Sequence, residues 1–221
     1  MEVFEAIITR RSVRRYQGKP VEWDKVITIL EAGKFAPSAG NLQNFKFVAV
    51  RDEDIRKQIA ESCLQQTWMT EAPVHIIVLS EPEKIKRFYG IRGERLYDIQ
   101  GGGAVIENML LTAHSLGLGS CWVGAFDEGK IRDIQNLPED IAVHGIVTIG
   151  YSAEKPQMPP KYRIEHIVFI EKWGQRKKIP YSSMGWWSVR LEKAVKDAKK
   201  AVKKGIKEFK KSDEKHKDTV H

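Results

Sequence analysis

The chain has 221 residues, of which 42% are hydrophobic and 30% are charged, and this balance is typical of a globular protein with one substantial core. Its two cysteines are too few for a disulfide scaffold and suit either a reducing, cytoplasmic setting or simply buried thiols. Apolar runs fall short of the roughly 18 residues that a membrane span needs, and the acidic N-terminus is not typical of a signal peptide.

The net charge of +8 is concentrated near the C-terminus. Residues 188–221 contain 12 Lys and Arg against 6 Asp and Glu, whereas the other 187 residues contain 25 and 23. The larger part of the chain is therefore nearly neutral, which argues against a folded body that binds nucleic acid.

The predicted elements mix helices and strands in an irregular order. Apolar spacing of three and four residues predicts helices over 2–9, 22–35, 52–63 and 106–119. Pro37 ends the second of these helices. Runs of β-forming residues predict strands over 45–50, 74–80, 120–124, 141–150 and 165–173. Because the order lacks a strict β-α-β repeat, we predict an α+β fold that occupies residues 1–174.

A group of basic residues follows the first predicted helix. The members that suit one ligand, called here the arginine cluster, are Arg10, Arg11, Ser12 and Arg14. Guanidinium groups beside a hydroxyl suit a phosphate, because the planar fork donates two charge-assisted hydrogen bonds. A second basic pair, Lys161 and Arg163, follows a proline-rich stretch and could meet the same anion. The alternative is a solvated surface that binds nothing.

An uncharged loop, APSAGNLQ, follows the second predicted helix. Its candidate binding residues are Pro37, Ser38, Ala39, Asn41 and Gln43. Small side chains, neutral amides and an accessible backbone fit a planar heteroaromatic ring with imide and carbonyl edges. The alternative is an ordinary turn between a helix and a strand.

The sequence resembles the nitroreductase-like family of FMN-dependent oxidoreductases from about residue 2 to 174. The motifs that carry the resemblance occur in the family's order and are RRSVRRY, APSAGNLQNFKFV, EAPVHIIV, HSLGLGSCWVGAFD and KYRIEHIVFIEKWG. The resemblance implies an α+β fold with a mixed, mostly antiparallel central sheet flanked by helices. It also implies an intertwined homodimer with two FMN sites at the subunit interface.

The resemblance assigns a role to each group of candidate residues. The arginine cluster would hold the FMN phosphate, ribityl chain and pyrimidine edge, and Lys161 and Arg163 would close on the phosphate. The APSAGNLQ loop would reach the flavin that the other subunit binds. The turn at Val123 and Gly124 would offer backbone N–H groups to flavin N5, and Gln66 would reach the ring.

The resemblance also implies the chemistry. No side chain is expected to be catalytic, because flavin N5 carries the hydride and the protein binds, orients and tunes. Arg14 is the candidate cation that raises the redox potential. Hydride would pass from NADH or NADPH to an electron-poor acceptor, such as a nitroaromatic or a quinone, by a ping-pong mechanism. The alternative within the family is a reductive dehalogenase or a flavin-fragmenting enzyme, with residues 83–100 covering the ring.

The C-terminal residues depart from the common family pattern. We predict a connector over 175–187, a basic amphipathic helix over 188–211 and a disordered tail over 212–221. The helix would dock on its own dimer, and contact with a membrane or nucleic acid is the alternative. The GGGAV stretch at 101–105 lacks the spacing of a dinucleotide motif, and the histidines lack metal-ligand spacing, so no Rossmann or metal site is predicted.

Overall fold

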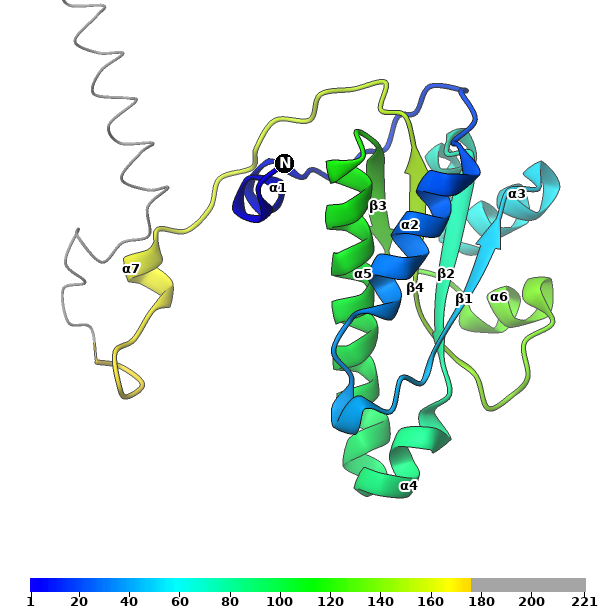
Figure 1. The fold of residues 1–221 in the computed structure, drawn as a ribbon. Helices are drawn as coiled ribbons and strands as arrows, with labels where there is room; N and C mark the ends of the chain where they lie inside the picture. The colour runs from blue at the N-terminus through cyan, green and yellow to red at the C-terminus, as the bar shows by residue number, and fades with distance from the viewer. Residues whose placement is uncertain (176–221) are drawn as a thin grey trace, which may run out of the picture. The chain divides into compact units, whose positions relative to one another are not determined.

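The computed structural model describes residues 1–175 in two compact units that divide after Pro159 (Figure 1). The first unit contains the sheet and six of the seven α-helices of the described chain. The described part of the second unit contains one short helix, α7 (Ile164–Ile167). The predicted basic helix over 188–211 and the predicted tail over 212–221 lie outside the described residues, as does the connector beyond residue 175.

A four-stranded antiparallel sheet forms the centre of the first unit (Figure 1). Its strands are β1 (Phe45–Val50), β2 (Val74–Ser80), β3 (Gly119–Val123) and β4 (Ala142–Gly150), arranged in the order β1-β2-β4-β3. All three strand pairs are antiparallel, so the prediction of a mixed sheet is corrected for this unit. Parallel pairing is limited there to an isolated bridge between Ser12 and Ser120.

The predicted fifth strand over 165–173 is wrong. Residues Ile164–Ile167 form α7 instead, and the N–H of Val168 donates to the carbonyl of Ile164 at 3.0 Å. The apolar residues Ile164, Ile167 and Val168 have the three- and four-residue spacing of one helical turn. A short apolar run of this kind fits both the two-residue period of a strand and the period of a helix. The local hydrogen bond shows that it is a helix here.

Helices cover both faces of the sheet (Figure 1). The α-helices of the first unit are α1 (Val3–Thr9), α2 (Trp23–Lys34), α3 (Glu53–Ser62), α4 (Pro82–Arg92), α5 (Asp98–Ser115) and α6 (Glu128–Gln135). Short turns of other helix types are η1 (Ala39–Asn41), η2 (Thr67–Glu71) and the π-helix η3 (Gly93–Tyr97). One apolar cluster joins α2 and α5 to the sheet, and a second joins α3 and α6 to its other face.

The central helix α5 is longer at its start than the predicted helix over 106–119. It begins at Asp98 and includes the three glycines of GGGAV. A Cβ atom at Gly102 would lie 2.5 Å from the ring of His144 on β4, so glycine permits the helix to approach the sheet closely there. The sequence places the start of this helix at residue 106, after the glycines, whereas in the structure the glycines lie inside the helix.

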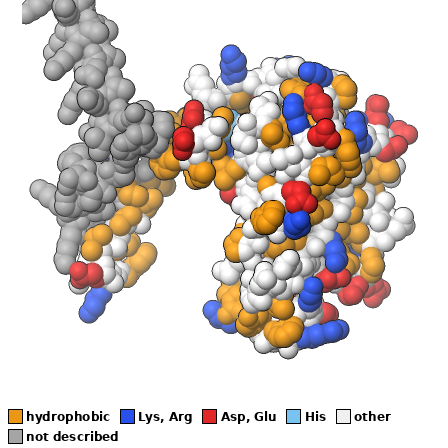
Figure 2. Space-filling model, in the orientation of Figure 1, with side chains coloured by type: hydrophobic (Ala, Val, Ile, Leu, Met, Phe, Trp, Pro, Cys, Tyr) orange, Lys and Arg blue, Asp and Glu red, His pale blue; other side chains and the backbone are white. Residues whose placement is uncertain are grey.

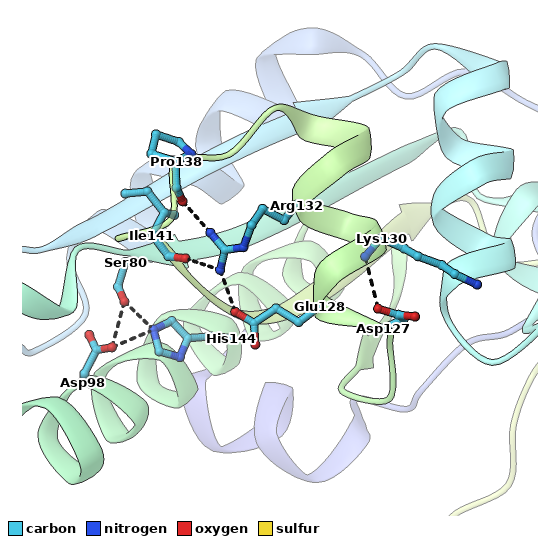
Figure 3. Close-up of polar contacts among 9 residues, drawn as sticks. All are labelled: Ser80, Asp98, Asp127, Glu128, Lys130, Arg132, Pro138, Ile141 and His144. Atoms are coloured by element: carbon cyan, nitrogen blue, oxygen red, sulfur yellow. Dashed lines mark hydrogen bonds and ion pairs between the residues drawn. The ribbon is translucent and has the colours of Figure 1, made fainter.

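Helix α6 was not predicted, and two sets of side-chain contacts define its start and its anchor (Figure 3). The carboxylate of Asp127 accepts from the backbone N–H of Lys130 at 3.1 Å and caps the first turn. Arg132 donates to Glu128 at 3.0 Å and to the carbonyls of Pro138 and Ile141, which ties the helix to the chain entering β4.

The surface of the first unit agrees with the near-neutral charge found for this part of the sequence. Acidic and basic side chains are interspersed on the face that Figure 2 shows. No helix in residues 1–175 is long and apolar enough to cross a membrane.

Candidate functional site

The arginine cluster lies on an extended segment that crosses the start of β3. The N–H of Val13 donates to the carbonyl of Ser120 at 3.0 Å, and the N–H of Ala153 donates to the carbonyl of Arg15 at 2.9 Å. The carboxylate of Glu154 accepts from the N–H groups of Arg14 and Arg15 at 2.6 and 3.1 Å. The backbone of this segment is therefore fixed on both sides, and its side chains have defined directions.

Arg14, Gln66 and the turn after β3 are brought close together. The guanidinium of Arg14 lies over the ring of Trp68 at 5.8 Å. Trp68 belongs to η2, which starts directly after Gln66. The side-chain amide of Gln66 donates to the carbonyl of Ala125 at 3.4 Å. Three predicted site segments that are far apart in the sequence thus meet in one region of the first unit.

The turn at Val123 and Gly124 offers backbone rather than side chains. The side chain of Val123 is buried, whereas Gly124 is exposed. A Cβ atom at Gly124 would meet only Nε1 of Trp122, at 3.7 Å. Another molecule can therefore approach the main chain of this turn closely.

Cys121 lies beneath the arginine cluster. Burial raises the pKa of its thiol, while Arg14, a hydrogen bond with Ser12 and then Arg10 partly offset that rise. The thiol is therefore protonated near neutral pH, which suits a small buried side chain better than a nucleophile. The thiol is therefore influenced by three members of the arginine cluster, Arg14, Ser12 and Arg10.

Arg10 and Arg11 differ in their surroundings. Among the described residues, Nε of Arg10 is buried without a hydrogen-bond partner and lies 3.6 Å from a carboxylate oxygen of Glu107 on α5. The guanidinium of Arg11 instead donates to the carbonyls of Ile8 and Arg10 at 2.8 and 2.6 Å, where α1 ends. Arg11 also lines a cavity of about 400 Å³, together with Ser120 and His114. Arg10 thus retains an N–H donor for a ligand, whereas Arg11 already donates hydrogen bonds to two backbone carbonyls.

The APSAGNLQ loop lies at the other end of α5 and is held by its own polar groups. The N–H of Gln43 donates to the hydroxyl of Ser38 at 3.0 Å, and the side-chain amide of Gln43 donates to Oδ1 of Asn41 at 3.3 Å. Pro37, Asn41 and Gln43 are exposed, and Ser38 and Ala39 are partly buried.

The loop and the arginine cluster of one chain do not meet. The residue that follows the loop, Asn44, bonds to Asp98 at the first turn of α5, whereas Arg10 pairs with Glu107, nine residues further along the helix. Nine residues of α-helix span about 14 Å. The two halves of the predicted site therefore lie in different places along α5.

Lys161 and Arg163 belong to the second unit and are described within it. Arg163 donates to both carboxylate oxygens of Glu165, at 3.1 and 3.3 Å. Their predicted contact with a phosphate stays a prediction. Within residues 1–175, no group of three or more His, Cys, Asp or Glu side chains could hold a metal ion.

Three residues of this site were not predicted from the sequence. They are Trp68, Glu107 and Glu154. Trp68 follows Gln66 by two residues, so an aromatic side chain beside a candidate ligand was the available signal. Glu107 and Glu154 carried no such signal, because each acts on a group that lies far from it in the sequence.

Comparison with known proteins identifies the family to which this α+β fold, with its cationic segment beside β3, belongs. The model of the Nitroreductase family matches residues 7–68 and 63–151. A provisionally named NADH dehydrogenase/NAD(P)H nitroreductase of Methanothermobacter thermautotrophicus is 35% identical over 179 residues, which cover 78% of this chain and 88% of that protein. This chain therefore belongs to the nitroreductase family.

Two further similar proteins have names that describe an activity. The FMN reductase [NAD(P)H] of Bacillus subtilis is 27% identical, over 72% of this chain and 70% of that protein. The structure of an FMN-dependent nitroreductase from Clostridium difficile R20291 has a TM-score of 0.62 and 26% identity, over 71% of this chain and 91% of that one.

Proposed function

We propose that this protein is an FMN-dependent NAD(P)H oxidoreductase that reduces electron-poor small molecules such as nitroaromatics or quinones. The observation that carries the proposal is the meeting of Arg14, Gln66 and the turn after β3 in a member of the nitroreductase family. The names of the relatives from Bacillus subtilis and Clostridium difficile support FMN as the cofactor and NAD(P)H as the donor.

The residues of the arginine cluster fit FMN chemically. Nε of Arg10 is buried and lacks a hydrogen-bond partner among residues 1–175. Together with the hydroxyl of Ser12 it suits a phosphate, which accepts several charge-assisted bonds. Arg14 supplies a cation that Trp68 holds in place, and such a cation suits the pyrimidine edge, where negative charge collects on reduction.

FMN, when bound, takes up hydride from the nicotinamide and passes it to the acceptor. The chain binds and orients the cofactor and sets its potential. Arg10 and Ser12 would anchor the phosphate, and the phosphate contact that the family resemblance implies for Lys161 and Arg163 stays a prediction. The exposed backbone of Gly124 would offer an N–H group to the ring, and Gln66 fixes this turn through the carbonyl of Ala125.

The proposed assembly is a homodimer with two shared FMN sites. The exposed loop residues Pro37, Asn41 and Gln43 would contact the flavin held by the partner's arginine cluster, with Ser38 and Ala39 beside them. The separation of the loop from its own Arg10 along α5 supports this arrangement. A two-fold interface would then complete both sites in the same way.

Separate half-reactions test the proposal. The purified protein, reconstituted with FMN, is first reduced by NADH or NADPH without oxygen, and the loss of flavin absorption is followed. A nitroaromatic or a quinone is then added and should restore the absorption. Steady-state rates over a matrix of donor and acceptor concentrations should give parallel double-reciprocal lines. A protein that cannot be reconstituted with FMN would contradict the proposal.

A further inference from the structure

A buried carboxylate at the start of α5 joins three parts of the first unit. Asp98 is 2% exposed and accepts from Nδ2 of Asn44 at 2.6 Å and from the hydroxyl of Ser80 at 2.8 Å. Nε2 of His144 lies 3.3 Å from the same carboxylate. Figure 3 shows Ser80, on β2, and His144, on β4, pointing toward Asp98. One carboxylate therefore connects two central strands with Asn44, the residue that follows the APSAGNLQ loop.

This group is not a nucleophilic triad, although it contains Ser, His and Asp. The hydroxyl of Ser80 lies 2.7 Å from Nε2 of His144, and Asp98 meets the same ring nitrogen. A triad needs the nucleophile and the carboxylate on opposite nitrogens of the ring. All three side chains are also buried, so no substrate reaches them. The group is better explained as a structural junction.

The junction keeps Asp98 ionised. Burial opposes its charge, but hydrogen bonds from His144, Ser80 and Asn44 outweigh burial and hold the pKa of Asp98 below its usual value. A buried carboxylate that accepts several hydrogen bonds is costly to leave without one of them. The donor from Asn44 is therefore a strong constraint on where the loop ends.

The loop itself needs such a constraint. Three of its residues, Gly40, Asn41 and Gln43, have φ values of 56°, 54° and 47°, in the left-handed region. Two of the three have side chains, for which this conformation costs free energy and persists only when the surroundings enforce it. The bond from Gln43 to Ser38 closes the loop internally, but it does not fix the loop to the sheet. Asn44 does so through Asp98 and through Glu81, whose N–H donates to the carbonyl of Asn44 at 3.0 Å and whose carbonyl accepts from Nδ2 of Asn44 at 3.4 Å.

A second contact fixes the tip of the loop from the same side. The hydroxyl of Tyr89 on α4 lies 2.6 Å from the position that a Cβ atom of Gly40 would occupy. The ring of Tyr89 packs edge-on against Tyr97 at 5.4 Å, and Tyr97 is the last residue of η3 and precedes Asp98. The segment from α4 to the first residue of α5 therefore contacts both the tip and the end of the loop.

We propose that Asp98 is a positioning residue of the shared flavin site, because through Asn44 it holds the APSAGNLQ loop in the conformation that completes the site of the partner subunit. The inference rests on the proposed function, since it needs FMN at the interface. It adds a buried junction that touches no cofactor atom yet governs the affinity of a site on the other chain.

The test compares two variants that each remove one hydrogen bond to the same carboxylate. Asn44→Ala breaks the connection to the loop, whereas Ser80→Ala breaks a connection between β2 and α5. Both should lower the unfolding midpoint by similar amounts. Only Asn44→Ala should weaken FMN binding, by about tenfold. Amide hydrogen exchange in residues 38–43 should accelerate in the FMN-free Asn44→Ala protein and stay unchanged in Ser80→Ala.

The outcomes separate the inference from the proposed function. If the unchanged protein binds no FMN, the proposed function fails. If that protein binds FMN but the two variants weaken binding equally, or neither does, the role of Asp98 is overturned. Should Asn44→Ala not fold, Asn44→Ser is used, because its hydroxyl is too short to reproduce the amide contact but keeps a polar group in the buried site.

Discussion

The guanidinium of Arg14 lies over the ring of Trp68 at 5.8 Å, so a cation proposed to tune the cofactor has its position set by an aromatic side chain. Cation–π contacts are worth about 0.5–2 kcal/mol. This relationship lets the tuning role of Arg14 be tested without altering its charge.

Replacing Trp68 with leucine should lower the two-electron midpoint potential of bound FMN, because Arg14 is then free to move away from the developing negative charge. A contact of this strength corresponds to a change of about 10–40 mV. Redox titration against a reference dye measures it. Trp23→Leu is the matched control, because it removes an equally long contact, with Arg51 at 5.8 Å, that involves no candidate site residue. An equal potential in Trp68→Leu and the unchanged protein would remove Arg14 from the tuning role.

Replacing Arg10 with alanine should weaken FMN binding by about tenfold or more, because charge-assisted hydrogen bonds contribute about 1.5–3 kcal/mol each. Fluorescence titration of the FMN-free protein measures the affinity. Arg15→Ala is the control, since Arg15 is exposed in the same segment and was assigned no cofactor contact. If both variants bind FMN as the unchanged protein does, Arg10 belongs to a solvated surface.

The strands of this fold could be predicted where burial leaves a continuous signal. The run VHIIVLS is buried along its whole length, and β2 occupies the predicted residues 74–80. The start of α5 could not be predicted, because Gly102 packs closely against the ring of His144, and this contact joins residues that are distant in the sequence. The antiparallel order likewise depends on pairings between distant strands.

The candidate site divides in the same way. The arginine cluster and the APSAGNLQ loop could be found from composition and family motifs, because their residues are adjacent in the sequence. The contact of Asn44 with Asp98 joins residues 54 positions apart, and nothing local to either residue indicates it. The residues that support the candidate site could therefore be found only in the structure. The candidate ligand-binding residues could be found from the sequence.

Replacing Gly124 with valine should slow reduction by NADH or NADPH more than it weakens FMN binding. Among the described residues a Cβ atom at Gly124 meets only Trp122, at 3.7 Å, so the fold should tolerate the change. It would occupy the space beside the flavin ring, while the phosphate contacts stay intact. Stopped-flow reduction and FMN titration measure the two effects. Gly18→Val is the control, because a Cβ atom there meets nothing within 4 Å. Turnover that survives the Gly124 change intact would mean that this turn does not contact the ring.

His75 should make the fold less stable in acid. Burial, followed by repulsion from Arg56, outweighs the bond to the carbonyl of Met69 and lowers the pKa of His75 to about 4. Its unfolded pKa is about 6.5. Between these values the unfolded chain binds more protons, so stability from this group is complete above pH 6.5 and is lost as the pH falls to 4. The loss is about 3 kcal/mol.

The His75→Gln variant isolates this contribution. The glutamine amide can donate to the carbonyl of Met69, as the ring nitrogen does, but it does not titrate. Urea unfolding at pH 7, 5.5 and 4 should show a smaller loss of stability in the variant than in the unchanged protein. Parallel pH profiles in the two proteins would show that His75 accepts a proton in the fold without cost.

Complementation between two defective chains should restore one FMN site per dimer. One chain carries Arg10→Ala, and the other carries Asn41→Gly, which removes the amide but keeps a residue that adopts the left-handed conformation at φ 54°. If the loop serves the partner's flavin, one site of the mixed dimer has both changes and the other has neither. If the loop serves its own chain, each site has one change and no intact site exists. Mixed dimers purified through two different tags and titrated with FMN should therefore bind one equivalent with full affinity. Light scattering confirms the assembly in the same sample, and a monomer that binds one FMN at full affinity would contradict both the shared site and the role of the loop.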